Sequence, residues 1–117
     1  MDILSRLFGG GSAVLSATDY KSRYVDGKEE HVLVDVRTPE EFASGHIPGA
    51  LNIPLQELGQ KTDRLAKDKA LILYCRSGSR SAHAAGMLGR LGYTNVQDLG
   101  GIYHWTSAGY PIKTGRK

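Results

Sequence analysis

Short, continuous apolar segments alternate along this chain with segments in which apolar residues recur at helical spacing. Residues 32–36 and 70–74 have the length and composition of strands that are buried on both faces of a sheet. Residues 79–91 instead place their apolar side chains on one face of a helix. Further strands are predicted at residues 13–15, 50–53 and 95–99. This alternation predicts an α/β domain with a five-stranded, mainly parallel sheet that is flanked by helices on both faces.

Polar residues mark where two of the helices begin. Ser16 and Asp19 have the spacing of a capping box that opens a helix to about Val25. Residues 38–41, Thr-Pro-Glu-Glu, supply an N-cap, a proline at the first helical position and a glutamate at the third, so a short helix is predicted there. Weaker helical signals cover residues 54–66 and the segment from Gly101 to Trp105.

Composition limits the classes of protein to which the chain can belong. The 117 residues fit one domain, which we place at residues 13–115, with residues 1–12 as an N-terminal extension. The net charge of +3 is spread without a basic run, so no nucleic-acid partner is predicted, and an anionic small substrate suits this balance. No apolar stretch approaches transmembrane length, so no membrane partner is predicted.

The single cysteine, Cys75, excludes an intrachain disulfide and a cysteine-based zinc cluster, and we predict neither a metal nor a cofactor. A free thiol without an export signal favours the cytoplasm. No second thiol in the chain is available to attack a modified Cys75. Any covalent intermediate on it must therefore be resolved by an outside acceptor.

Cys75 stands where a predicted strand meets a Ser/Gly/Arg loop that opens a helix. Ligands bind outside the carboxyl ends of strands in open parallel sheets, and a loop of backbone N–H groups before a helix favours an anion. That field also favours the reactive thiolate. The alternative is a small buried structural cysteine. Two arginines within five residues of it favour a nucleophile, and the candidate substrate-binding residues are Arg76, Ser77, Gly78, Ser79 and Arg80.

Three motifs in the chain resemble those of the rhodanese family. Residues 35–42 (Asp-Val-Arg-Thr-Pro-Glu-Glu-Phe) with residues 45–50 (Gly-His-Ile-Pro-Gly-Ala) are similar to its front signature. Residues 75–81 (Cys-Arg-Ser-Gly-Ser-Arg-Ser) resemble its active-site loop. Leu99-Gly100-Gly101, Trp105 and Gly109-Tyr110-Pro111 resemble its closing signature. The resemblance covers nearly the whole chain and implies the rhodanese-like α/β domain of a single-domain, thiosulfate sulfurtransferase-like protein.

The activity implied by the resemblance is sulfur transfer through a persulfide on Cys75. Thiolate attack on a donor such as thiosulfate releases sulfite, and cyanide or a thiol then takes the sulfur. Backbone N–H groups of residues 76–80 are expected to hold the persulfide, and Arg76 and Arg80 to bind the sulfonate. Asp35 and Arg37 are expected to tie neighbouring loops together. His46 is expected to be a structural histidine, with the role of base for Cys75 as the alternative.

Other functions remain open at this point. Cysteine phosphatases place an arginine six positions after the cysteine, whereas Arg80 comes five positions after Cys75 and Ser81 takes the sixth. The shorter loop favours sulfur over a phosphoryl group and leaves a phosphatase or arsenate reductase as the weaker alternative. A sulfur carrier or interaction module with a protein donor or acceptor has the same residues and is not separated by sequence.

Overall fold

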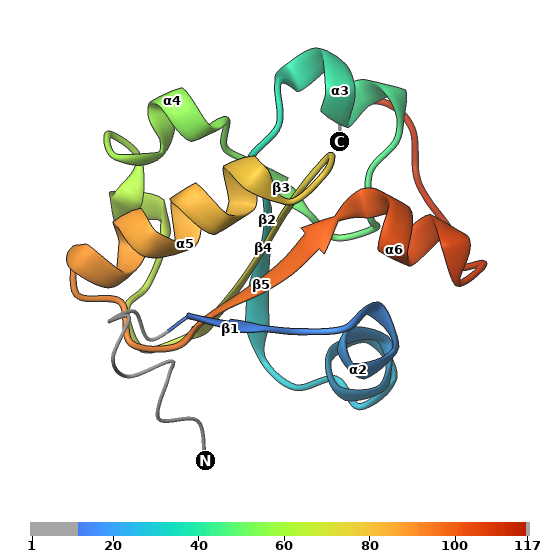
Figure 1. Ribbon diagram of the computed structural model, residues 1–117, viewed down its shortest axis with the longest axis horizontal. Helices are drawn as coiled ribbons and strands as arrows, with labels where there is room; N and C mark the ends of the chain where they lie inside the picture. Colours follow the sequence, from blue (N-terminus) through green and yellow to red (C-terminus); the bar gives the residue numbers. More distant parts are fainter. Residues whose placement is uncertain (1–11, 117) are drawn as a thin grey trace.

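The computed structural model describes residues 12–116 of the chain. The strands are β1 (Ser12–Val14), β2 (His31–Asp35), β3 (Leu51–Asn52), β4 (Ala70–Cys75) and β5 (Val96–Gly101). The helices are α2 (Ala17–Tyr20), α3 (Pro39–Ser44), α4 (Leu55–Leu58), α5 (Ser79–Arg90) and α6 (Ile102–Ser107), with a π-helical turn η1 (Lys21–Asp26) and a 3₁₀ turn η2 (Thr62–Arg64). Figure 1 shows these elements around one twisted sheet.

The sheet has the order β1-β5-β4-β2-β3, and every pairing in it is parallel. The predicted α/β architecture, a parallel sheet flanked by helices, is therefore confirmed. Three longer strands, β5, β4 and β2, form the centre, and the two edges are the short β1 and β3. All six residues of β4 are buried, as the continuous apolar run predicted.

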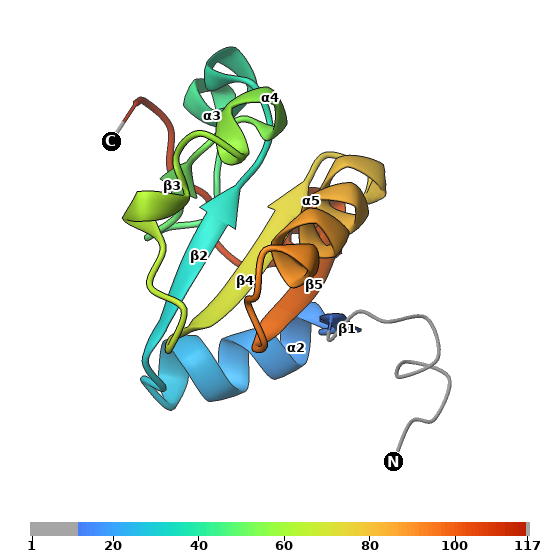
Figure 2. The same cartoon turned by 90° about the vertical axis from the view of Figure 1, so that its left-hand side faces the viewer.

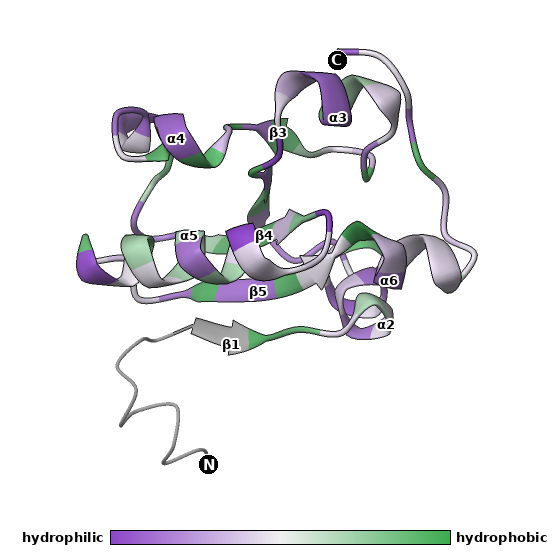
Figure 3. Ribbon diagram, turned by 45° about the horizontal axis from the view of Figure 1, so that its top comes forward, coloured by the Kyte–Doolittle hydropathy of each residue, from purple (hydrophilic) through white to green (hydrophobic). Residues whose placement is uncertain are grey.

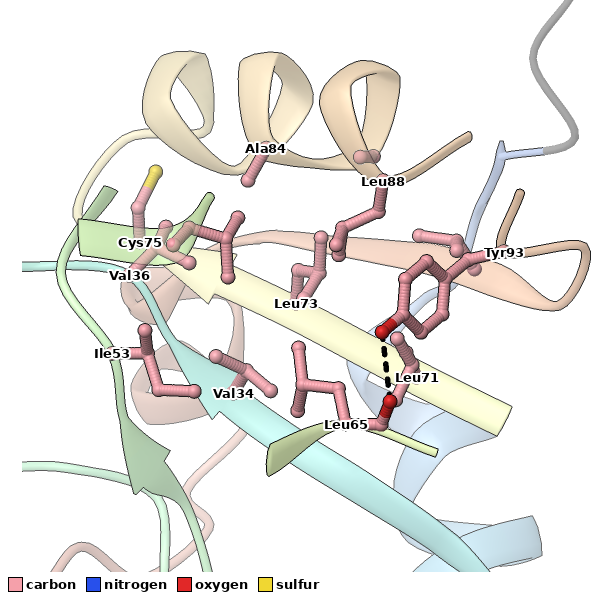
Figure 4. Packing of buried hydrophobic residues seen from close by; sticks show 13 residues of the cluster. Val34, Val36, Ile53, Leu65, Leu71, Leu73, Cys75, Ala84, Leu88 and Tyr93 are labelled. Carbon is pink, nitrogen blue, oxygen red and sulfur yellow. Dashed lines mark hydrogen bonds between the residues drawn. The ribbon is translucent and has the colours of Figure 1, made fainter. Parts of the chain in front are cut away.

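A separate apolar core covers each face of the sheet, because side chains alternate in direction along each strand. Leu71, Leu73 and Cys75 of β4 join the core beneath α4 and α5. Figure 4 shows this core, with the Tyr93 hydroxyl donating to the Leu65 carbonyl oxygen at 2.7 Å. Ile72 and Tyr74 join the other core, beneath α2, η1 and α6. Figure 2 shows α2 and α5 on opposite sides of the sheet.

Two of the predicted helices depart from expectation. The segment 54–66 is not one helix, because α4 ends at Leu58 and only a 3₁₀ turn follows. Gly59 interrupts the helix, and the Tyr93 hydroxyl holds the carbonyl groups of Thr62 and Leu65 in a different path. The helix that the Ser16 cap opens does reach Asp26, but its second half is π-helical.

The helix beginnings follow their capping residues. The Ser16 hydroxyl accepts from the Asp19 N–H at 3.0 Å, and Thr38 forms a full capping box with Glu41. α5 is amphipathic, and Figure 3 shows hydrophobic and hydrophilic residues along it. The predicted extension lies outside the described residues except for Ser12, which begins β1. No helix among residues 12–116 combines the length and apolar character that a bilayer crossing needs.

Candidate active site

Cys75 is the last residue of β4, and the loop that follows it folds back over its sulfur. The Gly78 N–H donates to Cys75 Sγ at 3.0 Å, and the Ser81 N–H donates to it at 3.4 Å. Gly78 has φ 108°, a left-handed conformation that a side chain disfavours, and this turn aims its N–H at the sulfur. The Cys75 side chain is fully buried. Figure 4 shows its sulfur pointing toward the start of α5.

Gly78 is also the N-cap of α5, so the sulfur lies beside the first turn of a 12-residue helix. Ser79 is thus the first helical residue. The N–H groups in a first helical turn have no partner within the helix, and they carry partial positive charge. Cys75 Sγ accepts one of them, from Ser81, in addition to the loop N–H of Gly78. The arrangement stabilises negative charge on this sulfur.

Ser81 is a candidate functional residue that the sequence reasoning missed. Its hydroxyl is buried, lies 3.5 Å from Cys75 Sγ and donates to the Gly78 carbonyl oxygen at 3.2 Å. The Cys75 thiol, when protonated, can donate to this hydroxyl, and a thiolate can instead accept from it. Its place in the helix could have indicated this contact, because the third residue of a helix faces back toward the loop that precedes it.

Arg80 is turned toward a carboxylate. Its guanidinium donates to both oxygens of Glu41, at 2.7 and 2.9 Å, across 39 residues of sequence. The Arg80 guanidinium, by hydrogen bonding, holds the pKa of Glu41 down at about 2, and Glu41 in turn raises the pKa of Arg80. The sequence led us to expect that Arg80 binds the sulfonate of the donor, and that role stays a prediction. In this structure its guanidinium is held by Glu41.

Three other loop residues are exposed to solvent. Arg76, Ser77 and Ser79 are exposed, so their side chains are accessible at the mouth of the loop. The two N–H groups that contact the sulfur belong to Gly78 and Ser81, and Ser81 lies outside the expected range of 76–80. The loop is folded around the Cys75 sulfur, and the substrate-binding roles of Arg76, Ser77, Gly78, Ser79 and Arg80 stay predictions.

Asp35 and Arg37 form a buried ion pair at the end of β2. Arg37 donates to both carboxylate oxygens, with the shortest distance 2.6 Å, and also to the Gly45 carbonyl oxygen at 2.7 Å. The Asn52 amide donates to the backbone oxygens of both residues. Burial lowers the pKa of Arg37, but the hydrogen bonds that Arg37 donates to Asp35, together with the charge of that carboxylate, outweigh it and the net shift is upward. This network joins the loop after β2 to Gly45 and to β3.

The contacts of the His46 side chain are with Phe42 and not with Cys75. Its Nδ1 donates to the Phe42 carbonyl oxygen at 2.8 Å, and its ring stacks on Phe42 at 3.7 Å between centroids. The side chain is 1% exposed. These contacts are those of a structural histidine. Within residues 12–116, no group of three or more His, Cys, Asp or Glu side chains is arranged to hold a metal ion.

Comparison with known proteins places this geometry in a family. The profile of the rhodanese-like domain matches residues 16–108. The chain belongs to the rhodanese-like family. A protein of Allochromatium vinosum named sulfurtransferase is 44% identical over 85 residues, which cover 72% of this chain and 79% of the relative. The thiosulfate sulfurtransferase PspE of Escherichia coli is 38% identical over 71 residues, 59% of this chain and 68% of that protein.

Solved structures agree with the family assignment. The crystal structure of a rhodanese-related protein from Thermoplasma volcanium superposes with a TM-score of 0.76 at 35% identity. The match covers 86% of this chain and 97% of that one. The fold of this chain is therefore that of a rhodanese-like domain.

Proposed function

We propose that this rhodanese is a sulfurtransferase that carries sulfane sulfur as a persulfide of Cys75. Sulfurtransferase activity in general is supported by the family and by its relatives, and the finer mechanism rests on one observation. That observation is the pair of N–H groups, from Gly78 and Ser81, directed at a cysteine sulfur that ends a buried strand. Such donors stabilise a thiolate before transfer and an anionic persulfide after it.

The donor that we propose is thiosulfate, and a protein persulfide uses the same chemistry. Cys75 Sγ attacks the outer sulfur, the bond between the two sulfur atoms of thiosulfate breaks, and sulfite leaves with the electron pair. Arg76 is exposed at the loop mouth and is assigned to the sulfonate end of the donor. In the second half-reaction, cyanide or a thiol attacks the sulfane sulfur and Cys75 returns to the thiolate.

Phosphatase chemistry is less well supported by this loop. A phosphoryl transition state needs a guanidinium that spans its equatorial oxygens. The sixth position after Cys75 is Ser81, whose N–H and hydroxyl already lie against the sulfur. Arg80, the residue before Ser81, does carry a guanidinium, but that group donates two hydrogen bonds to Glu41.

Intact-mass spectrometry tests the proposal directly. We expect the protein to gain one sulfur atom on incubation with thiosulfate and to lose it as thiocyanate when cyanide is added. Cys75→Ser, which keeps the size of the buried side chain, is expected to gain nothing while unfolding at a similar urea concentration. Sulfur gained equally by Cys75→Ser would exclude the persulfide mechanism. A folded, reduced wild-type protein that gains no sulfur would exclude thiosulfate as the donor.

A further inference from the structure

The ion pair between Arg80 and Glu41 lies beside the cysteine loop and is accessible to solvent. Arg80 is the second residue of α5, directly before Ser81, whose N–H contacts Cys75 Sγ. The side chain of Arg80 is 33% exposed, and that of Glu41 is 25% exposed. Figures 1 and 2 show α3, which carries Glu41, and the beginning of α5 at the end of the sheet where β2 and β4 end. An anion that approaches the sulfur therefore meets this pair.

Glu41 is a fixed partner for Arg80. Its Oε1 accepts from the Thr38 N–H at 3.0 Å and from the Thr38 hydroxyl at 3.2 Å, so its own helix holds the carboxylate in place. Both oxygens also accept from the Arg80 guanidinium, in a bidentate geometry that adds energy and fixes orientation. The hydrogen bond with Glu41 is the chief cause that raises the pKa of Arg80, and the charge of Cys75 adds to it. The guanidinium is thus within the electrostatic range of the thiolate.

The ion pairs around the loop leave one guanidinium uncompensated. Arg76 is exposed, and its side chain takes part in no ion pair in the described part of the chain. Arg80 is neutralised by Glu41, and Asp35 by Arg37. These five side chains together present a single net positive charge to a ligand. Thiosulfate carries two negative charges, so one of them has no counter-charge among these groups while Glu41 holds Arg80.

We propose that Glu41 is a specificity-determining residue, which binds the Arg80 guanidinium and so adapts the site to sulfur donors that carry one negative charge. The proposal rests on the sulfurtransferase function stated above. The donor class is that of organic thiosulfonates, in which a carbon group replaces one charged oxygen of thiosulfate. Arg76 alone neutralises such a donor. Thiosulfate remains a substrate, but it is bound less tightly than a released Arg80 would allow.

Both kinds of donor react with Cys75 in the same way. The thiolate forms a bond to the terminal sulfur of the donor, and the bond between that sulfur and the sulfonyl sulfur breaks. The electron pair of the broken bond leaves with sulfite from thiosulfate, or with a sulfinate from a thiosulfonate. No oxidant, reductant or proton acceptor enters. A change in the ratio of the two loading rates between variants therefore measures how much donor charge the site accommodates.

Loading rates with two donors test the role of Glu41. Wild type, Glu41→Gln and the control Glu40→Gln are mixed with thiosulfate or methanethiosulfonate at one ionic strength, and intact mass follows the gain of sulfur. Glu40 is exposed on the same turn of α3 and forms no ion pair among the described residues, so it controls for loss of a surface charge. Because a charge-assisted hydrogen bond contributes on the order of tenfold in binding, we expect Glu41→Gln to load about tenfold faster with thiosulfate and at most about threefold faster with methanethiosulfonate. Glu40→Gln is expected to stay within about twofold of wild type with both donors, because water and salt screen an exposed charge.

A double-mutant cycle asks whether Glu41 acts through Arg80. In the Arg80→Gln background we expect Glu41→Gln to leave the ratio of the two loading rates unchanged, because the guanidinium that Glu41 binds is absent. A loosened loop would speed both donors alike, so the ratio separates charge from structure. The proposal is overturned if Glu41→Gln alone keeps the wild-type ratio, or if its effect persists in full without Arg80. Slower loading with thiosulfate would also overturn it, because Glu41 would then orient Arg80 for the donor.

Protection by unreactive anions separates this proposal from the underlying function. Sulfate and methanesulfonate have the charges of the two donors but no sulfane sulfur, and at constant ionic strength they are tested for protection of Cys75 from iodoacetamide. We expect Glu41→Gln to lower the sulfate concentration that halves the alkylation rate about tenfold, and that of methanesulfonate at most about threefold. If neither donor loads wild type but this shift is observed, the donor assignment fails and the role of Glu41 stands. Equal protection of wild type and Glu41→Gln by sulfate would overturn that role.

Discussion

Glu41 is one carboxylate with two tasks, and replacing it with glutamine separates them. Its Oε1 accepts from the Thr38 N–H at 3.0 Å in the capping box, and both of its oxygens accept from Arg80. Glutamine at this helix position can still complete the capping box, so Glu41→Gln removes mainly the charge that faces Arg80. The pKa of Glu41 is lowered from 4.5 to about 2, chiefly by the hydrogen bond from Arg80.

This pKa difference sets an upper limit on the stabilisation. A depression from 4.5 to about 2 corresponds to about 3.4 kcal/mol at about 1.36 kcal/mol per pKa unit. The side chain is 25% exposed, and water screens the pair, so we expect Glu41→Gln to lower the free energy of unfolding by about 1–2 kcal/mol at pH 7.

The pH dependence follows from the direction of the shift. Because the pKa of Glu41 is lower in the folded protein than in the unfolded one, its contribution is complete above pH 4.5 and is lost as the pH falls toward 2. The stability difference between wild type and Glu41→Gln should therefore shrink over that range. Urea unfolding followed by the fluorescence of buried Trp105 measures it at each pH.

A matched control is available on α4. Glu57 pairs with Lys61 four residues away, and 44% of its side chain is exposed, so we expect Glu57→Gln to cost under about 0.5 kcal/mol. A Glu41→Gln difference that stayed constant between pH 7 and pH 2 would refute the electrostatic reasoning. So would a loss at pH 7 no larger than that of Glu57→Gln.

Two further substitutions test the surroundings of the sulfur. Ser81→Ala removes the hydroxyl 3.5 Å from Cys75 Sγ, and we expect alkylation of the thiol by iodoacetamide to slow about tenfold, the equivalent of one hydrogen bond of about 1.4 kcal/mol. Unchanged alkylation would show that the N–H groups alone activate the thiol. Gly101→Ala would place a methyl group 2.6 Å from the Arg76 carbonyl oxygen, so we expect a loss of about 1–3 kcal/mol in urea unfolding. Gly59→Ala, which meets nothing within 4 Å, is the control, and an equal loss there would contradict the packing argument.

The sequence pattern predicted the structure correctly where local preference and tertiary packing favour the same conformation. β4 is apolar throughout because both of its faces are covered, and the Thr38 cap uses only its own helix. Pattern failed at residues 54–66, where the path depends on a hydroxyl from Tyr93, about 30 residues later. The π-helical turn that follows Tyr20 is likewise invisible, because its residues have ordinary helical character.

The same division holds for the site. The position of Cys75 at a strand end, before a loop that opens a helix, follows from local sequence and was predicted. The partner of Arg80 was not, because Glu41 lies 39 residues away and only the folded sheet brings the two together. Ser81 was overlooked because serine in the first turn of a helix has many ordinary uses. Its burial against the sulfur is a property of the packed loop.

The complete burial of Cys75 determines which sulfur compounds can reach it. A disulfide is attacked at a sulfur that carries a substituent on either side, and the loop that covers Sγ hinders the approach of such a bulky group. A donor whose reactive sulfur is terminal meets less obstruction. In the proposed persulfide, the outer sulfur lies about 2 Å from Sγ, at the length of a sulfur–sulfur bond. The unmodified protein should therefore resist mixed-disulfide formation with oxidised thiols and with a second copy of itself, while the proposed persulfide form is open to attack.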